Sequence, residues 1–265
     1  MNNTLIKGLQ VVELLAHSDT PQSLTDIANR LGLAKSNVHR LLIALSELKY
    51  VIRDESSARY NASIKLWELG SAVLGKLDLK RHAEHWMSTL KDQTGETVHL
   101  SVLDRDEVVY VHKIESDNPI RAYTQIGGRV PAYCVATGKA MLAYRSAETL
   151  QRVTASLVQI TPATIAQPKR FLQEIEKIRK QGYAVNRGEW REGVYGVAAP
   201  ILDGSGQVIA ALGLSGPSTR FRATQIKQFA EKLGRATEGI TQSLGGHAAL
   251  PTLAHVTRRM VAAKP

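Results

Sequence analysis

The sequence predicts an α+β protein with two folded domains, and three observations predict it. Residues 24–45 show the apolar spacing of two short helices joined by a tight turn, and a β-prone hairpin follows at residues 50–60. From residue 96 onward, β-hairpin patterns are interspersed with helical segments. At 265 residues, of which 43% are hydrophobic, the chain is long enough for two packed cores. We therefore expect an N-terminal winged helix-turn-helix domain and a C-terminal domain of strands and helices.

The chain opens with an amphipathic helix over residues 4–17. Leu5, Leu9, Val12 and Leu15 recur at helical spacing, so we expect this stripe to face inward. The helix would then pack behind the helix-turn-helix.

The helix-turn-helix stretch carries the first functional signal. Ser23 stands three residues before Asp26, a capping-box-like start, and Gly32 closes the first helix. The second helix starts around Ser36, and small polar and basic side chains crowd its first turn and a half. In a helix-turn-helix this end enters the DNA major groove, so we predict DNA contacts from Lys35, Ser36, Asn37, His39 and Arg40. An ordinary helical hairpin with solvated charges is the alternative.

A small hairpin follows the second helix directly and completes a winged helix. Residues 50–53 and 58–60 are β-prone, and residues 54–57 have turn chemistry. Arg53 and Arg59 flank the hairpin. They would contact the phosphate backbone, or else be solvated surface charges.

Composition narrows the class of protein. The formal net charge is +10, but residues 1–80 hold 10 Lys and Arg against 8 Asp and Glu, so bulk charge adds only modest steering toward DNA. No run approaches the roughly 18 apolar residues of a membrane span, and the N-terminus lacks a signal-peptide pattern. Cys134 is the single cysteine, which fits a reducing compartment. We expect a cytoplasmic protein without a membrane partner.

Four segments follow from these patterns. They are a DNA-binding domain at 1–62 with its helix-turn-helix at 24–45, a linker helix at 63–78, a domain of strands and helices at 79–245 and a flexible tail at 246–265. The linker helix is apolar on more than one side, so it either contributes to a dimer contact or packs against its own chain. A dimer would read two DNA half-sites.

The C-terminal domain begins with a helix over residues 79–94 and a hairpin. One face of that hairpin carries His99, Ser101, Tyr110 and His112, which either border a pocket or lie satisfied beneath helices. Further elements are expected as a strand at 120–125, helices at 147–156, 168–181 and 224–244, and strands at 194–202 and 207–214.

The Gly138-Lys139 pair does not belong to a phosphate-binding P-loop, because Tyr133 stands where that motif needs glycine and Ala140 where it needs Ser or Thr. The helix start near residues 136–138 offers unpaired N–H groups that would suit a small carboxylate, unless it is a plain capped helix.

Two further kinds of chemistry, metal binding and catalysis, have weak support in the sequence. His82 and His85 lack partners at zinc-ligand spacing, so we predict neither a metal nor a cofactor. An enzyme using Cys134 as nucleophile with His99 or His112 as base is the alternative function, but no spacing supports a triad. We predict that the protein is not an enzyme.

The order and spacing of several short motifs resemble the IclR-type bacterial transcriptional regulators from about Lys7 to Gly245. These motifs are Leu24-Thr-Asp-Ile-Ala, Leu33-Ala-Lys-Ser-Asn-Val-His-Arg-Leu-Leu, Leu66-Trp-Glu-Leu-Gly, Gly95-Glu-Thr-Val-His-Leu, Ala136-Thr-Gly-Lys-Ala, Gly182-Tyr-Ala-Val, Gly193, Ala198-Ala-Pro and Ser215-Gly-Pro. The resemblance implies a winged helix followed, at residues 79–245, by an effector-binding domain that is GAF-like or profilin-like and has a curved antiparallel sheet. It also implies a ligand-responsive regulator of a catabolic operon that binds double-stranded operator DNA as a homodimer or a dimer of dimers.

The resemblance further implies an effector pocket for a small organic acid. The matching positions are Tyr133, Cys134, Ala136, Thr137, Gly138, Asn186, Glu189, Trp190, Tyr195, Gly196, Gly213 and Ser215. Many relatives have Asp where this chain has Asn186, and Cys where it has Gly196. Loss of an anionic group and of a thiol suggests a larger, negatively charged ligand, and Trp190 and Tyr195 are available for stacking. The hypothesis is an aromatic carboxylate.

Overall fold

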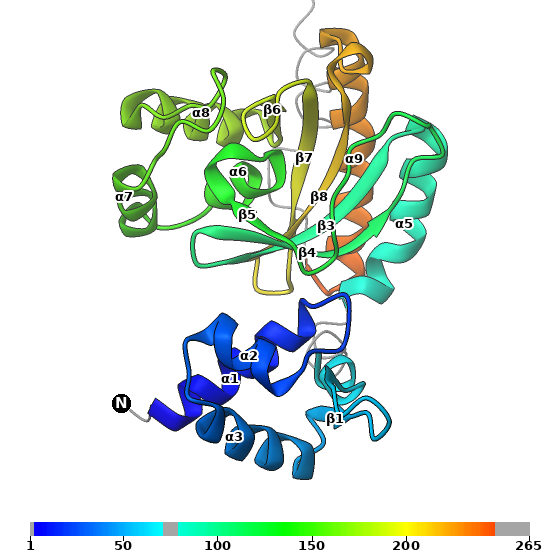
Figure 1. Ribbon diagram of the computed structural model, residues 1–265. Helices are drawn as coiled ribbons and strands as arrows, with labels where there is room; N and C mark the ends of the chain where they lie inside the picture. The colour runs from blue at the N-terminus through cyan, green and yellow to red at the C-terminus, as the bar shows by residue number, and fades with distance from the viewer. Residues whose placement is uncertain (1–2, 71–78, 247–265) are drawn as a thin grey trace, which may run out of the picture. The chain divides into compact units, whose positions relative to one another are not determined.

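The computed structural model describes residues 3–70 and 79–246 (Figure 1). The chain divides into two compact units, Met1–Leu77 and Asp78–Pro265. Residues 65–70 are helical, whereas the rest of the predicted linker helix and residues 247–265 of the predicted tail lie outside the described residues. Within the described ranges, no helix is long and apolar enough to cross a membrane.

The N-terminal unit is a winged helix, as the sequence predicts. Three helices precede a two-stranded antiparallel hairpin: α1 (Asn3–Ala16), α2 (Leu24–Leu31), α3 (Lys35–Glu47), β1 (Val51–Arg53) and β2 (Tyr60–Ala62). Its core is formed by Val11, Leu15, Ile27, Ala28, Val38, Leu42, Val51 and Tyr60.

Local hydrogen bonds set the limits of α2. The Ser23 hydroxyl accepts the backbone N–H of Asp26 at 3.1 Å, and the Asp26 carboxylate accepts the N–H of Ser23 at 3.3 Å, so the predicted capping box is present. Gly32 ends the helix in the left-handed region at φ 63°, where glycine has no steric penalty. The chain can therefore turn sharply into α3.

The expected inward stripe of α1 is wrong at two positions. Leu5 and Leu9 are 61% and 55% exposed, and the buried positions are Gly8, Val11 and Leu15. The buried face of α1 is therefore rotated from the predicted one, toward Gly8. A Cβ at Gly8 would lie 3.8 Å from the Leu41 side chain of α3, so α1 and α3 approach each other at Gly8.

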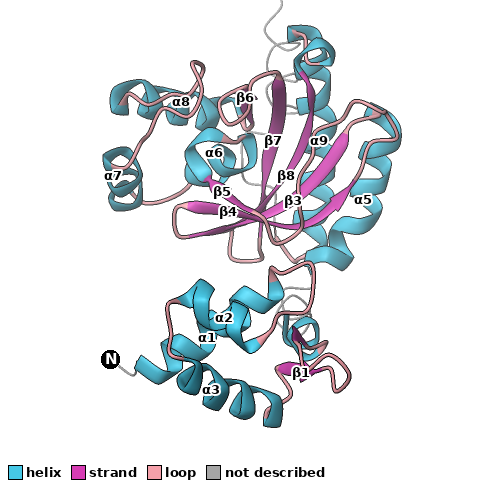
Figure 2. Cartoon of the chain, in the orientation of Figure 1, coloured by secondary structure: helices cyan, strands magenta, loops and turns pink. Residues whose placement is uncertain are grey.

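The C-terminal unit is built on a six-stranded, fully antiparallel sheet with strand order β5-β4-β3-β8-β7-β6 (Figure 2). The strands are β3 (Thr97–Asp104), β4 (Glu107–Ile114), β5 (Arg129–Pro131), β6 (Ala184–Arg187), β7 (Val194–Leu202) and β8 (Val208–Pro217). This agrees with the curved antiparallel sheet that the family resemblance implies.

Helices cover the two faces of the sheet unequally (Figure 1). On one face lie α5 (Leu79–Thr94) and α9 (Ala223–Ser243), whose apolar residues share a core with β3, β7 and β8. On the other face lie α6 (Ala136–Leu142), α7 (Ala147–Ala155) and α8 (Pro168–Gln181), around a second core. The second face is the one that leaves space for a cavity.

The predicted strand at residues 120–125 is wrong. This segment has no regular secondary structure, and β5 takes the edge position beside β4 instead. Two side chains bind backbone carbonyls of this segment: Arg220 donates to the carbonyl of Ile120 at 3.1 Å, and Lys113 donates to that of Thr124 at 2.7 Å. It thus belongs to a long β4–β5 loop, residues 115–128.

A bulge in β4 changes the faces of the β3–β4 hairpin. Ser101 pairs with Tyr110 but Leu100 pairs with His112, so Val111 is an extra residue on β4. The side-chain alternation shifts at this point, and His112 accordingly contacts Glu84 of α5 at 2.8 Å. The expectation that His112 shares a face with His99 and Tyr110 is therefore wrong.

The start of α6 packs extremely closely against the turn before it. A Cβ on Gly138 would lie 2.1 Å from the carbonyl oxygen of Ala132, and one on Gly213 of β8 would lie 2.7 Å from Thr137. Both positions require glycine because neighbouring atoms occupy the space, and both bring α6 onto the sheet.

We expect Gly138→Ala to lower the free energy of unfolding by about 3 kcal/mol, because backbone must move to admit the methyl group. Gly234→Ala in α9 is the matched control, since a Cβ there meets nothing within 4 Å. It should stabilise the protein by about 1 kcal/mol through helix propensity. Urea unfolding followed by circular dichroism measures both, and equal effects of the two substitutions would contradict the packing argument.

Candidate functional site

The first turn of α3 presents a polar, basic surface. Lys35, Ser36, His39 and Arg40 are exposed, and the half-buried Asn37 accepts a hydrogen bond from the Arg40 guanidinium at 2.8 Å. The first turn of α3 contains no acidic residue. The five residues predicted to contact DNA therefore lie together at one end of one helix.

The two wing arginines are held differently. Arg53 lies over the Tyr60 ring, with its guanidinium carbon 5.9 Å from the ring centroid. Arg59 donates to the carbonyl of Pro21 at 3.1 Å and lies 3.9 Å from the Asp26 carboxylate. Both arginines are exposed, and Arg59 also links the wing to the start of α2.

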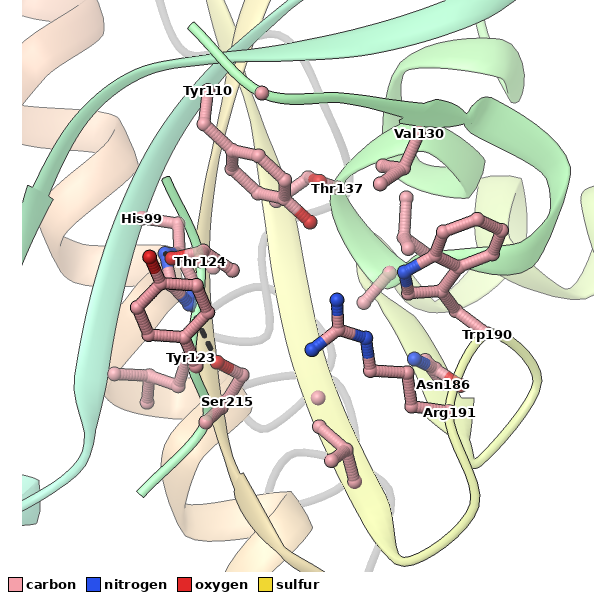
Figure 3. Close-up of a pocket in the computed structure, with 18 of the residues that line it drawn as sticks. His99, Tyr110, Tyr123, Thr124, Val130, Thr137, Asn186, Trp190, Arg191 and Ser215 are labelled. Atoms are coloured by element: carbon pink, nitrogen blue, oxygen red, sulfur yellow. Dashed lines mark hydrogen bonds between the residues drawn. The ribbon is translucent and has the colours of Figure 1, made fainter. Parts of the chain in front are cut away.

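The C-terminal unit contains a cavity of about 250 Å³ against the face of the sheet that α6 covers (Figure 3). Its walls come from the sheet strands, the start of α6, the β4–β5 loop and the β6–β7 loop, residues 188–193. The size matches a small molecule, at the low end of known ligand pockets. The lining residues are His99, Tyr110, Ala122, Tyr123, Thr124, Gln125, Gly128, Arg129, Val130, Val135, Ala136, Thr137, Asn186, Trp190, Arg191, Val194, Gly196, Gly213, Leu214 and Ser215.

Charge in the cavity has one sign. No Asp or Glu is among the lining residues, and Arg129 is neutralised by Glu107 at 2.8 Å and Asp104 at 2.6 Å. Arg191 is exposed; its backbone carbonyl accepts the N–H of Val194 at 3.2 Å, whereas its side chain makes no hydrogen bond or ion pair with a described residue. Figure 3 shows its guanidinium extending into the space between Trp190 and Ser215. Among the lining residues, Arg191 is thus the cation available to an anionic ligand.

Neutral polar groups line the opposite wall. His99 lies 2.5 Å through Nε2 from the Ser215 hydroxyl and 3.2 Å through Nδ1 from the Thr124 hydroxyl, and its ring centroid is 5.3 Å from that of Tyr110. Burial lowers the pKa of His99 to about 4 and raises that of Tyr110 to about 12. Both side chains are uncharged at neutral pH, so they offer hydrogen bonds without charge.

Of the twelve positions predicted for the effector pocket, seven line this cavity. They are Ala136, Thr137, Asn186, Trp190, Gly196, Gly213 and Ser215. They come from α6, β6, β7, β8 and the β6–β7 loop, so the fold gathers residues that are up to 79 positions apart in the sequence.

The other five predicted positions lie behind or beside the cavity wall. Tyr133 donates its hydroxyl to the carbonyl of Val158 at 2.9 Å, Cys134 is fully buried, and Gly138 abuts the Ala132 backbone. Tyr195 packs with the core on the opposite face of the sheet, and Glu189 is paired with Lys139 inside the unit. Alternation along β7 explains Tyr195, because its neighbour Gly196 takes the cavity face.

The enzyme alternative finds no support in this geometry. Burial raises the pKa of the Cys134 thiol to about 12, so the nucleophilic thiolate is scarce at neutral pH. His112 lies on the other face of the sheet, beside Glu84. Among the described residues, no cluster of His, Cys, Asp or Glu could hold a metal ion.

Sequence reasoning missed Arg191 and the contribution of the β4–β5 loop. Arg191 follows Trp190 in a polar, glycine-flanked loop, and a cation next to an aromatic residue in such a loop was the available signal. Tyr123 and Thr124 gave no such signal, because an irregular segment that folds over a sheet resembles a short strand in sequence.

Two family models match the chain. The IclR helix-turn-helix domain matches residues 4–55, and the bacterial transcriptional regulator IclR C-terminal domain matches residues 71–242. The chain belongs to the IclR family of bacterial transcriptional regulators. Members of this family are not enzymes: they bind DNA, respond to a small-molecule effector and form oligomers.

Individual relatives agree with this assignment. The HTH-type transcriptional regulator KdgR of Escherichia coli (strain K12) is 35% identical over 226 residues, which are 84% of this chain and 86% of KdgR. The crystal structure of Thermotoga maritima IclR is 32% identical, with a TM-score of 0.77, covering 92% of this chain and 100% of that one. An IclR homologue from Microbacterium hydrocarbonoxydans, solved in complex with 4-hydroxybenzoate, has a TM-score of 0.81 at 24% identity and covers 91% of this chain and 99% of that one.

The buried His99 predicts a pH-dependent stability. As pH falls below 6.5, the unfolded chain takes up a proton that the folded chain resists until about pH 4. Stability is therefore lost in this window, by about 2 kcal/mol at pH 5 relative to pH 7.5. Urea unfolding at both pH values measures this loss in the wild type and in His99→Gln. The loss in His99→Gln should be smaller by about 2 kcal/mol. Equal losses in the two proteins would show that His99 is not the group responsible.

Proposed function

We propose that this regulator senses a small aromatic carboxylate in the cavity of its C-terminal domain. The observation that carries the proposal is the Arg191 guanidinium, which extends into a cavity with no acidic lining residue and has no carboxylate partner among the described residues. A cation at the cavity wall without a carboxylate partner favours an anionic ligand there, and the planar guanidinium matches a carboxylate with two parallel hydrogen bonds.

The aromatic part of the proposal rests on the walls beside Arg191. Trp190, Tyr110 and Tyr123 all line the cavity, so a planar ring would find edge and face contacts there. The volume of about 250 Å³ suits one ring rather than a long chain. The Microbacterium homologue, solved with 4-hydroxybenzoate, is 24% identical to this chain and shares its fold; the aromatic ligand class proposed for this chain follows from its own cavity side chains.

The start of α6 supplies a second, weaker source of positive potential. Ala136 and Thr137 line the cavity, and the first N–H groups of a helix have no acceptor within the helix. These groups would supplement Arg191 at the carboxylate.

The output of the sensor is the α3 surface. In the proposed mechanism the effector shifts the population of dimer geometries and so changes operator affinity. In a homodimer or a dimer of dimers, two copies of the winged helix would read two half-sites of the operator. The regulator would act in the cytoplasm, at the promoter of a catabolic operon.

We expect Arg191→Gln to weaken benzoate binding by about 10- to 100-fold, because the charged hydrogen bonds to the carboxylate are lost. Calorimetric titration of the full-length protein with benzoate measures the effect. Arg187→Gln, an exposed arginine of β6 outside the cavity wall, is the matched control and should bind like the wild type.

The same titration with a panel of aromatic and aliphatic acids tests the ligand class. Binding of aliphatic keto acids alone would overturn the aromatic proposal, and unchanged affinity in Arg191→Gln would remove that residue from the site.

For DNA, we expect Arg40→Ala to weaken operator binding about 10-fold or more, because the Arg40 guanidinium would lose contact with a guanine or a phosphate. Asn37→Ala should weaken it less. Mobility shifts with the DNA upstream of the protein's own gene, over a series of salt concentrations, measure both. Arg170→Ala in α8 removes the same charge from an exposed site of the other unit and should leave binding unchanged, whereas unchanged binding in Arg40→Ala at all salt concentrations would contradict the proposal.

A further inference from the structure

We propose that the buried ion pair between Lys139 and Glu189 is a positioning device, which holds Trp190 and Arg191 in the cavity wall. The inference rests on the proposed function, since it assigns the residues that keep the effector-contacting part of the β6–β7 loop in place.

Lys139 uses its whole donor capacity inside the unit. Its side chain is fully buried, and Nζ donates to both carboxylate oxygens of Glu189, at 2.6 and 2.7 Å, and to the carbonyl of Val185 at 2.7 Å. An ammonium group has three N–H donors, and all three are satisfied. Lys139 therefore connects α6 to both β6 and the loop that follows it.

Glu189 is held from several directions as well. Its side chain is 6% exposed, and its backbone N–H donates to the Asn186 side chain at 2.8 Å. The Thr164 hydroxyl donates to its carbonyl at 2.7 Å, and the Thr161 hydroxyl donates to the carbonyl of Gly188 at 2.7 Å. The carboxylate and the backbone of this loop are thus fixed separately.

Stability alone does not account for this pair. Removing two charges from water is costly, and replacing a buried ion pair with apolar side chains of similar volume is often neutral or stabilising. Van der Waals contacts between apolar side chains are not directional, so an apolar pair would not hold the loop in one position. The three hydrogen bonds from Lys139 are directional and hold the loop in one position.

Both partners of the ion pair lie close in sequence to residues that line the cavity. Glu189 directly precedes Trp190 and Arg191, and Lys139 follows Ala136 and Thr137 by two or three residues on α6. With Asn186, three positions before Glu189, five cavity-lining residues thus lie within three positions of the two ion-pair partners. A displaced Glu189 would move the Arg191 guanidinium relative to the start of α6.

The test measures both the stability of the protein and the position of the β6–β7 loop in each variant. The parent is the full-length protein with Trp67→Phe and Trp86→Phe, so that Trp190 is the single tryptophan and reports on the loop. The double variant Lys139→Met/Glu189→Met should keep the thermal unfolding midpoint of the parent within a few degrees. Acrylamide quenching of Trp190 should rise at least about twofold, and affinity for benzoate should fall at least about tenfold.

The conservative variant Glu189→Gln should behave in the opposite way. Its amide oxygen still accepts from Lys139, so Trp190 quenching and benzoate affinity should stay within about threefold of the parent. Its unfolding midpoint should fall, because the Lys139 charge loses its counter-charge.

The outcomes separate the two proposals. Unchanged quenching in the double variant, or affinity that follows stability in both variants, would show a purely structural role and overturn the inference. If the parent protein binds no aromatic acid, the proposed function fails, and the quenching comparison still decides whether the ion pair positions the loop.

Discussion

The close approach of α6 to the sheet is the constraint on which the C-terminal cavity depends. Gly138 lies against the Ala132 carbonyl and Gly213 against Thr137, so helix and sheet meet at distances that no side chain would allow. This places Ala136 and Thr137 at the cavity wall. A helix standing farther from the sheet would leave a wider and more hydrated space, and the contacts that define the cavity would be lost.

The polar and charged side chains around α6 form two layers. The deeper layer holds the satisfied pair of Lys139 and Glu189, with burial raising the pKa of the carboxyl and Lys139 lowering it. The layer facing the cavity holds the uncharged His99 and the cation of Arg191. The charges of the buried pair therefore neutralise each other, and the charge that remains available faces the space where a ligand would bind.

Much of the architecture could be predicted from local patterns. The capping box at Ser23, the glycine at Gly182 and the period of α8 mark helices whose limits depend on neighbouring residues alone. The failures share a different cause, which is tertiary context. The bulge at Val111 has no composition signature, and the extended segment at 120–125 has the composition of a strand but lies over the sheet instead of in it.

The candidate site was predictable to the extent that a family pattern supplied it. Trp190 and Asn186 could be placed by their motif, whereas Arg191 depends on how a six-residue loop folds. Lys139 illustrates the limit best. Its sequence setting suggested a comparison with phosphate-binding loops, and only the fold shows that its ammonium group is completely enclosed.

The extra residue in β4 has a consequence for how the cavity tolerates changes in chain length. Because the bulge leaves Val111 without a partner on β3, Leu100 lies opposite His112 and His99 lies opposite Lys113. Deleting the codon for Val111 would keep these pairs, since His112 would then follow Tyr110 in regular alternation. His112 would stay on the α5 face and Lys113 on the cavity face, so an insertion or deletion at this one position changes the bend of the strand and leaves the side chains that line the cavity in place.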